Sequence, residues 1–317
     1  MSFSTFLTSS RRNPAIRIGG SILLLLLLVV VLPRHKVEDA LRSMPPYTLL
    51  AAVPIFLAIQ VLGCLKWHLI VNRAGARLPW IQSVRCYFGG LFSNLVLPGV
   101  IGGDVVTVTL ALSRHAKKES IVSGTLASRV LDLAALLLLT CLAVFVFPHR
   151  LVPVGERLIE LVLGVFLGAG MLAVIALILL RQKIRAQVTA YWQAFAIGFQ
   201  RPVFMLLIFG LSVLSQASLV VLMQWVGVEC GLALPLRAWL FAWPLAKLSA
   251  FVPITLAGIG TRELVLAALL VPFGAAAPSA GAAGLAWDAV FIIGSLASGV
   301  ISKVVGVVAP SREPCPT

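Results

Sequence analysis

Several charged and amide side chains lie inside segments of the sequence that are otherwise apolar. A charge at membrane depth is costly, so such residues usually contact a substrate, an ion or one another. Arginine suits a phosphate because its planar guanidinium can make two parallel hydrogen bonds. Carboxylates can hold such a cation in place or bind a cationic group. Seven residues are therefore candidates for contact with a polar ligand: Asn94, Asp104, Arg129, Asp132, Lys247, Arg262 and Glu263.

The candidates in the first half of the chain also have structural interpretations. Asp104 follows a pair of glycines where a helix is expected to begin, so it could be an N-cap, and the free N–H groups there would attract an anion. Arg129 and Asp132 are three residues apart and could pair on one helix face; alternatively, Asp132 holds Arg129 against a phosphate. Asn94 is expected to satisfy carbonyl groups left free by a break in the chain.

The charged candidates in the second half of the chain also have structural interpretations. Glu263 stands near the expected start of a helix, where it would act as a capping or dipole partner. Lys247 could extend to a membrane interface, or it could neutralise Asp104 or Glu263. Asp288 is expected to mark the outer membrane interface. Lys66, in the first half, is placed nearer to a cytoplasmic helix end.

No pattern typical of an enzyme or a metal centre accompanies these charges. The sequence has no G-x-S-x-G or H-x-x-x-x-D motif, and its glycine-rich stretch 99–103 lacks the Lys-Ser/Thr of a nucleotide loop. The 5 cysteines and 4 histidines are scattered without the spacing of metal ligands. We therefore expect no catalytic residue, no cofactor and no metal.

The composition places these residues in a membrane protein. Of the 317 residues, 60% are hydrophobic and 11% are charged, against roughly a quarter charged in soluble domains. The mean hydropathy is +1.04. The net charge of +14 fits basic loops that face anionic lipid on the cytoplasmic side. These values exclude a cytosolic enzyme, a nucleic-acid-binding module and a disordered chain.

The apolar pattern predicts an all-α polytopic membrane protein, a single integral domain over residues 1–317 with halves 1–150 and 151–317. Full spans are expected at 18–32, 47–70, 120–146, 158–180, 202–226 and 285–308. Segment 18–32 follows basic residues, as in a secretory signal. No small-residue cleavage site follows it, which favours a retained helix.

Two further segments, 80–112 and 236–271, are apolar but interrupted. In each, the part after the break is too short to cross a bilayer at about 1.5 Å per residue. We predict two re-entrant hairpins, compatible with an inverted repeat, whose breaks face a shared interior. Paired breaks of this kind indicate a transporter site near the membrane midplane. The break residues are Pro98, Gly99, Gly102, Gly103, Pro253, Gly258 and Gly260.

Basic residues in the loops predict the orientation. If both hairpins are re-entrant, most loop Lys and Arg residues, including those of the basic segment 181–201, fall on the same side as both termini. The positive-inside rule makes that side cytoplasmic. We therefore expect both termini in the cytoplasm of a bacterium, an inner-membrane location, and hairpins that enter from opposite sides. Hairpins that cross fully as two thin helices would give the same sidedness.

Three stretches together resemble a known family: 63–70 (GCLKWHLI), 90–104 (GLFSNLVLPGVIGGD) and 253–263 (PITLAGIGTRE). Their order and spacing are similar to the lysylphosphatidylglycerol synthase transmembrane region, the flippase domain of the multiple peptide resistance factor. The chain resembles stand-alone members of that family, which lack the synthase domain. It departs from the family pattern at Thr107, Ser128 and 255–258, where the family usually has Arg, an acidic residue and Thr-Pro-Gly-Gly.

The resemblance implies a protein that moves or places a polar lipid across the bilayer, with aminoacylated phosphatidylglycerol, hopanoids or polyprenyl-linked glycans as lipid classes. It also implies that Asn94, Asp104, Arg129, Arg262 and Glu263 line or shape the lipid path. We hypothesise a flippase-like translocator for a lipid with a polar or anionic head group, moving downhill or coupled to an ion. The alternatives are a non-catalytic membrane partner of a lipid- or glycolipid-modifying enzyme, and an intramembrane lipid transferase.

Overall fold

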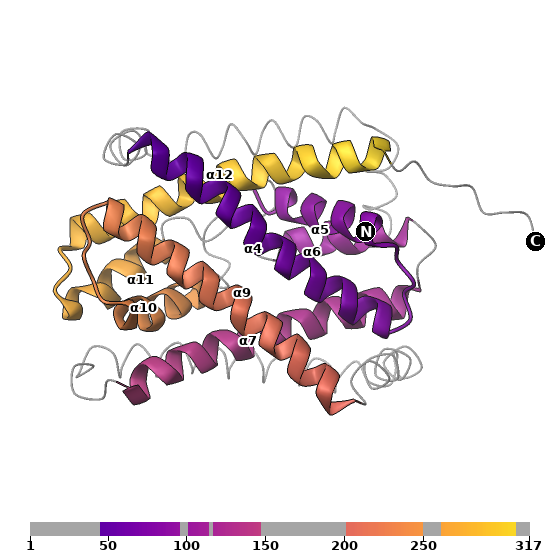
Figure 1. Ribbon diagram of the computed structural model, residues 1–317, viewed down its shortest axis with the longest axis horizontal. Helices are drawn as coiled ribbons and strands as arrows, with labels where there is room; N and C mark the ends of the chain where they lie inside the picture. The colour runs from indigo at the N-terminus through magenta and orange to yellow at the C-terminus, as the bar shows by residue number, and fades with distance from the viewer. Residues whose placement is uncertain (1–44, 96–100, 114–116, 147–200, 250–260, 309–317) are drawn as a thin grey trace, which may run out of the picture.

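The computed structural model describes residues 45–95, 101–113, 117–146, 201–249 and 261–308 (Figure 1). Within these residues, 4 helices are long and apolar enough to cross a membrane. They are α4 (Pro46–Arg73), α7 (Lys118–Val146), α9 (Pro202–Glu229) and α12 (Ala277–Val308). They confirm the spans predicted at 47–70, 120–146, 202–226 and 285–308, and with them an all-α integral membrane protein. The spans predicted at 18–32 and 158–180, and residues 181–200 of the basic segment, lie outside the described residues.

The ends of the long helices follow from local sequence. Helices α4 and α9 begin with Pro46 and Pro202, whose fixed φ suits a first turn and whose missing N–H is not needed there. Beyond their C-termini stand Gly75 and Gly231, with φ of 99° and 82°. Glycine adopts this left-handed conformation without steric cost, so both helices can end in a tight turn.

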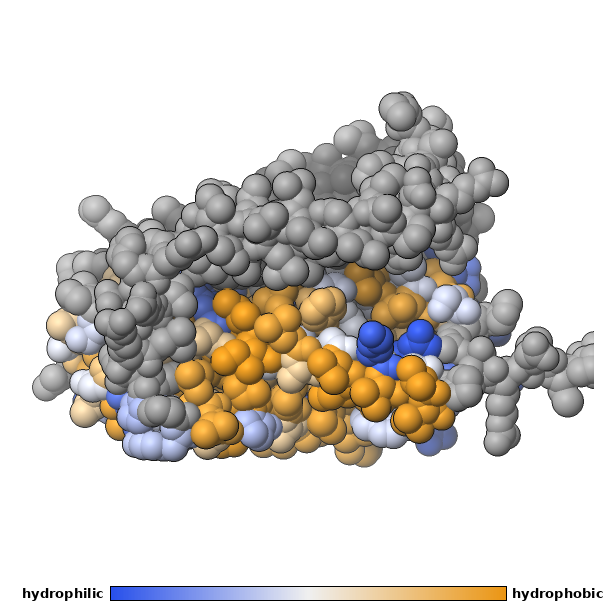
Figure 2. Space-filling view, turned by 90° about the horizontal axis from the view of Figure 1, so that it is seen from above, coloured by the Kyte–Doolittle hydropathy of each residue, from blue (hydrophilic) through white to orange (hydrophobic). Residues whose placement is uncertain are grey.

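The outward faces of the long helices are apolar. Large hydrophobic side chains are exposed along them, among them Leu126, Val130, Leu206, Leu214 and Val300. Figure 2 shows one largely hydrophobic face of this kind. An exposed face this apolar would promote aggregation in water, but it suits the hydrocarbon core of a bilayer.

Each interrupted segment forms two short helices that pack against each other. The first pair is α5 (Trp80–Ser93) with α6 (Ile101–Leu112), and the second is α10 (Leu236–Ser249) with α11 (Thr261–Leu270). Gly102 and Gly103 lie inside the first turn of α6 rather than in the connection. The other predicted break residues, Pro98, Gly99, Pro253, Gly258 and Gly260, lie outside the described residues.

The two hairpins pack on opposite ends of α12. Near its C-terminus, the Ser302 hydroxyl donates a hydrogen bond of 2.8 Å to the backbone carbonyl of Arg85 in α5. Near its N-terminus, Gly284 lies against the side chain of Glu263 in α11. Figure 1 shows α5 and α6 toward one end of the long helices and α10 and α11 toward the other. This placement agrees with hairpins that approach the centre from opposite sides.

The largest buried apolar cluster joins α4 to α9, α10, α11 and α12. Its aromatic residues meet edge to face: the ring of Trp287 lies 6.1 Å from Phe56 and 4.7 Å from Trp243, measured between centroids. Such contacts stabilise a pair beyond simple burial. The cluster fixes α10 and the start of α12 against the middle of α4.

The first hairpin depends on a close approach of glycines. A Cβ added at Gly90 would lie 1.8 Å from Thr107 Oγ1 and 2.7 Å from the carbonyl oxygen of Gly103. A Cβ added at Gly103 would lie 2.5 Å from the carbonyl oxygen of Gly90. The backbones of α5 and α6 therefore leave no room for a methyl group between them, as is typical where small residues bring membrane helices together.

Gly90→Ala is expected to destabilise the protein by about 1–3 kcal/mol, because the added methyl must displace the backbone of α6. The thermal unfolding midpoint in detergent, followed by circular dichroism, measures the effect. Gly210→Ala in α9 is the matched control, because a Cβ there meets nothing within 4 Å. The control should keep or raise the midpoint, since alanine favours helix over glycine. Equal midpoints for the two variants would contradict the close approach.

Candidate functional site

The helices surround a cavity of about 190 Å³, where a single water needs roughly 10–15 Å³. Every α-helix that the structure describes contributes to its wall. The first hairpin supplies Asp104, and the second supplies Lys247 and Arg262. Segments on either side of both breaks therefore share one interior.

The cavity brings together most of the residues selected from the sequence. Six of the seven candidates line it: Asn94, Asp104, Arg129, Asp132, Lys247 and Arg262. Of the predicted break residues, Gly103 is the one in the described part of the wall. Glu263 is not part of the described wall. Its side chain lies behind Arg262, against Gly284 of α12.

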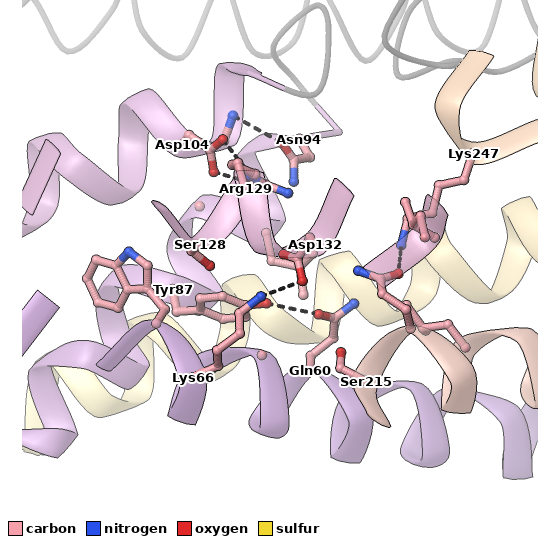
Figure 3. Close-up of a pocket in the computed structure, with 18 of the residues that line it drawn as sticks. Gln60, Lys66, Tyr87, Asn94, Asp104, Ser128, Arg129, Asp132, Ser215 and Lys247 are labelled. Atoms are coloured by element: carbon pink, nitrogen blue, oxygen red, sulfur yellow. Dashed lines mark hydrogen bonds and ion pairs between the residues drawn. The ribbon is translucent and has the colours of Figure 1, made fainter. Parts of the chain in front are cut away.

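Asp104 binds Arg129 in a bidentate ion pair between α6 and α7 (Figure 3). Arg129 donates from Nε to Oδ2 at 2.7 Å and from Nη2 to Oδ1 at 2.6 Å. The arrangement corrects two expectations: Arg129 does not pair with Asp132, and Asp104 lies within the first turn of α6 rather than at its N-cap. The side chain of Arg129 is 37% exposed and that of Asp104 is 22% exposed, so this pair is the more accessible part of the wall.

Asn94 connects the two helices of the first hairpin. It follows α5, and its Oδ1 accepts a hydrogen bond of 3.0 Å from the backbone N–H of Gly103. The first N–H groups of a helix have no partner within the helix, so the amide oxygen satisfies one of them. This contact of the amide oxygen adds to the expected role of Asn94 at carbonyl groups, which would involve its N–H donors and stays a prediction.

The partner of Asp132 is Lys66 of α4, whose ammonium forms an ion pair with the carboxylate. Lys66 is only 2% exposed, although the sequence analysis placed it nearer to a helix end. A signal was present, because Lys66 lies inside an apolar span and within the family-like stretch 63–70. The pair joins α4 to α7 beside the Asp104–Arg129 pair.

Arg262 is the centre of a buried cluster between α11 and α12. It forms ion pairs with Asp288 and, at 3.3 Å, with Glu263. Its guanidinium also lies 5.6 Å from the centroid of the Trp243 ring, a cation–π distance. Asp288, which was expected at the outer interface, is 2% exposed and is bound by Arg262 inside the helical body.

Lys247 of α10 contacts a neutral partner, which corrects the expectation that it neutralises Asp104. Its ammonium donates to Oε1 of Gln216 in α9 at 2.7 Å. A pair of two neutral residues also lines the cavity, where the Tyr87 hydroxyl donates to Oε1 of Gln60 at 3.2 Å. Sequence reasoning missed these wall residues, because amides and hydroxyls in helices carry no distinctive spacing. The uncharged polar wall residues also include Ser128 and Ser215.

The described residues include no group of three His, Cys, Asp or Glu side chains that could hold a metal ion. The polar wall consists instead of ammonium, guanidinium, carboxylate, amide and hydroxyl groups. Such groups can hold a polar ligand by charge and hydrogen bonds.

Lys66→Met is expected to lower stability by about 1–3 kcal/mol, because Asp132 keeps its charge and loses its partner. Asp132→Asn alone should cost more, since it leaves the more deeply buried Lys66 uncompensated. The double variant should recover most of the loss. Thermal unfolding of the three variants in detergent forms a double-mutant cycle, and purely additive losses would contradict the ion pair.

The chain was compared with known proteins. The sequence profile of the family described as "Lysylphosphatidylglycerol synthase TM region" matches residues 15–299. No curated protein and no solved structure matched. The family match covers the hairpins, the four long helices nearly to the end of α12, and every described residue of the cavity wall. The chain therefore belongs to the lysylphosphatidylglycerol synthase transmembrane region family.

Proposed function

We propose that the protein translocates a lipid with a polar head group across the membrane in which it lies. The head group would occupy the cavity while the acyl chains stay in the bilayer. The observation that carries this proposal is the meeting of both hairpins at one polar cavity inside a helical body whose outer faces are apolar.

The cavity offers what a polar head group needs in order to leave water. Hydroxyl, amide and charged groups of the wall can replace its hydration, which lowers the cost of transfer to the membrane interior. The apolar residues Phe56, Leu219 and Phe291 also line the cavity. A wall that combines apolar side chains with polar groups able to fix a ligand's orientation is typical of ligand sites.

Translocation requires access from each leaflet in turn. The two hairpins lie toward opposite ends of α12, and each contributes charged residues to the same cavity. A small movement of one hairpin would open one end, in the manner of transporters with inverted repeats. The sequence contains no nucleotide-binding motif, so we propose downhill or ion-coupled movement, in a bacterial inner membrane with both termini in the cytoplasm.

We expect no bond-making step in the cavity. The described wall contains no His or Cys, and its two carboxylates, Asp104 and Asp132, are engaged by Arg129 and Lys66. Carboxylate and imidazole groups are the commonest general bases, and both carboxylates of the described wall are held in ion pairs. The candidate lipids are anionic, aminoacylated, hopanoid or polyprenyl-linked.

Asp104→Asn is expected to abolish retention of a specific lipid, because it breaks the bidentate pair that joins α6 to α7 and gives this part of the cavity wall its shape. Mass spectrometry of lipids that co-purify in mild detergent provides the measurement. Glu119→Gln at the start of α7 is the control, since Glu119 does not line the cavity. Bulk phospholipid with both the wild type and Asp104→Asn would count against a head-group site.

Translocation itself is measured in liposomes, with a fluorescent analogue of the retained lipid and a membrane-impermeant quencher. The wild type should expose the analogue to the quencher faster than empty liposomes do. The rate with Asp104→Asn should be lower by about tenfold or more, because the variant loses a charge-assisted interaction. Glu263→Gln should also lose transport, because it disturbs Arg262. Full transport by both folded variants would refute the assignment.

A further inference from the structure

The cations of the cavity wall differ in how their charge is compensated. Three of them have a carboxylate partner: Lys66 with Asp132, Arg129 with Asp104, and Arg262 with Asp288 and Glu263. The fourth is Lys247. Within the part of the chain that the structure describes, its hydrogen-bond partner is the neutral side chain of Gln216.

The Lys247–Gln216 contact solvates the ammonium only in part. An ammonium has three N–H donors, and an amide oxygen can accept from it but cannot cancel its charge. Gln216 is itself only 6% exposed. An uncompensated cation at membrane depth is costly, so it is expected to meet an anion. Figure 3 shows Lys247 at the edge of the polar cluster, and its ammonium donates to Oε1 of Gln216 at 2.7 Å.

Lys247 is the cation of the described wall whose charge has no carboxylate beside it. The carboxylates at the cavity are each engaged by one of the other three cations. A ligand that enters this part of the cavity therefore meets an ammonium whose described hydrogen-bond partner is neutral.

We propose that Lys247 and Gln216 bind the anionic phosphate of the lipid head group, an inference that rests on the proposed function. A phosphate oxygen would accept hydrogen bonds from the free N–H donors of Lys247 and from the Gln216 amide. Arg129 and Arg262 are held by their own carboxylates and serve to shape the wall. The assignment moves the phosphate contact from the two arginines to the second hairpin's lysine.

The test is native mass spectrometry of the purified full chain with short-chain phosphatidylglycerol. Lys247→Gln should weaken binding about 10- to 100-fold, the usual effect of losing a charge-assisted hydrogen bond, while Lys247→Arg should retain most of it. Lys303→Gln is the matched control, because Lys303 is an exposed lysine of α12 that does not line the cavity. Equal binding by Lys247→Gln and the wild type would overturn the proposal.

Gln216→Glu is a second variant that keeps the test decisive if Lys247→Gln does not fold. It gives Lys247 the carboxylate that its neighbours already have, so it should fold and still lose phosphatidylglycerol. Unchanged binding by a folded Gln216→Glu protein would also overturn the proposal.

Two further probes separate the ligand classes. The first probe is an uncharged diacyl glycolipid. If it binds as tightly as phosphatidylglycerol, and binds the wild type and Lys247→Gln equally, the phosphate contact is overturned. The proposed transport of a polar lipid would still stand. No lipid bound by any variant would overturn both. Inorganic phosphate bound without any preference for the lipid would indicate a free-anion site and overturn the head-group assignment.

Discussion

The cost of an unpaired charge in the membrane interior governs the arrangement of this protein. Each carboxylate of the cavity wall is matched by a cation from another helix, and each match ties segments that are distant in sequence. Asp104 in the first hairpin binds Arg129 of α7, while Asp132 on the same α7 binds Lys66 of α4. Helix α7 therefore links the hairpin to α4 through two ion pairs on neighbouring turns.

The two hairpins differ in how deeply the ion pairs that anchor them are buried. Arg262 and its two carboxylates are almost fully buried, with side-chain exposure of 9% or less, and they clamp α11 to α12. The Asp104–Arg129 pair is partly accessible, at 22% and 37%. Removing one partner of a buried pair leaves an uncompensated buried charge, which costs more than breaking an accessible pair. Loss of Asp288 or Glu263 is therefore expected to cost more stability than loss of Asp104.

The sequence predicted the class of fold and the residues of the site better than it predicted their partners. Long apolar segments indicate spans directly, and the rarity of polar side chains within apolar segments selected five charged residues and Asn94, which share one cavity. Pairing depends on which helix faces which. Arg129 and Asp132 share a helix face, yet each finds its partner on another helix. Asp288 was misplaced because α12 begins at Ala277, which puts this residue about three turns inside the helix.

The charges of the cavity bear on the head group of the proposed lipid substrate. Four cations and two carboxylates line the described wall, and Glu263 and Asp288, which pair with Arg262 from outside it, bring the carboxylates to four as well. Thr107 and Ser128, where the family usually carries charges, add neutral hydroxyls to the same wall. A cationic head group would find both carboxylates of the wall already bound, whereas an anionic one could meet Lys247, whose described partner is neutral. Membership of the family therefore does not by itself identify the head group, and the proposed contact at Lys247 is what would select an anionic lipid.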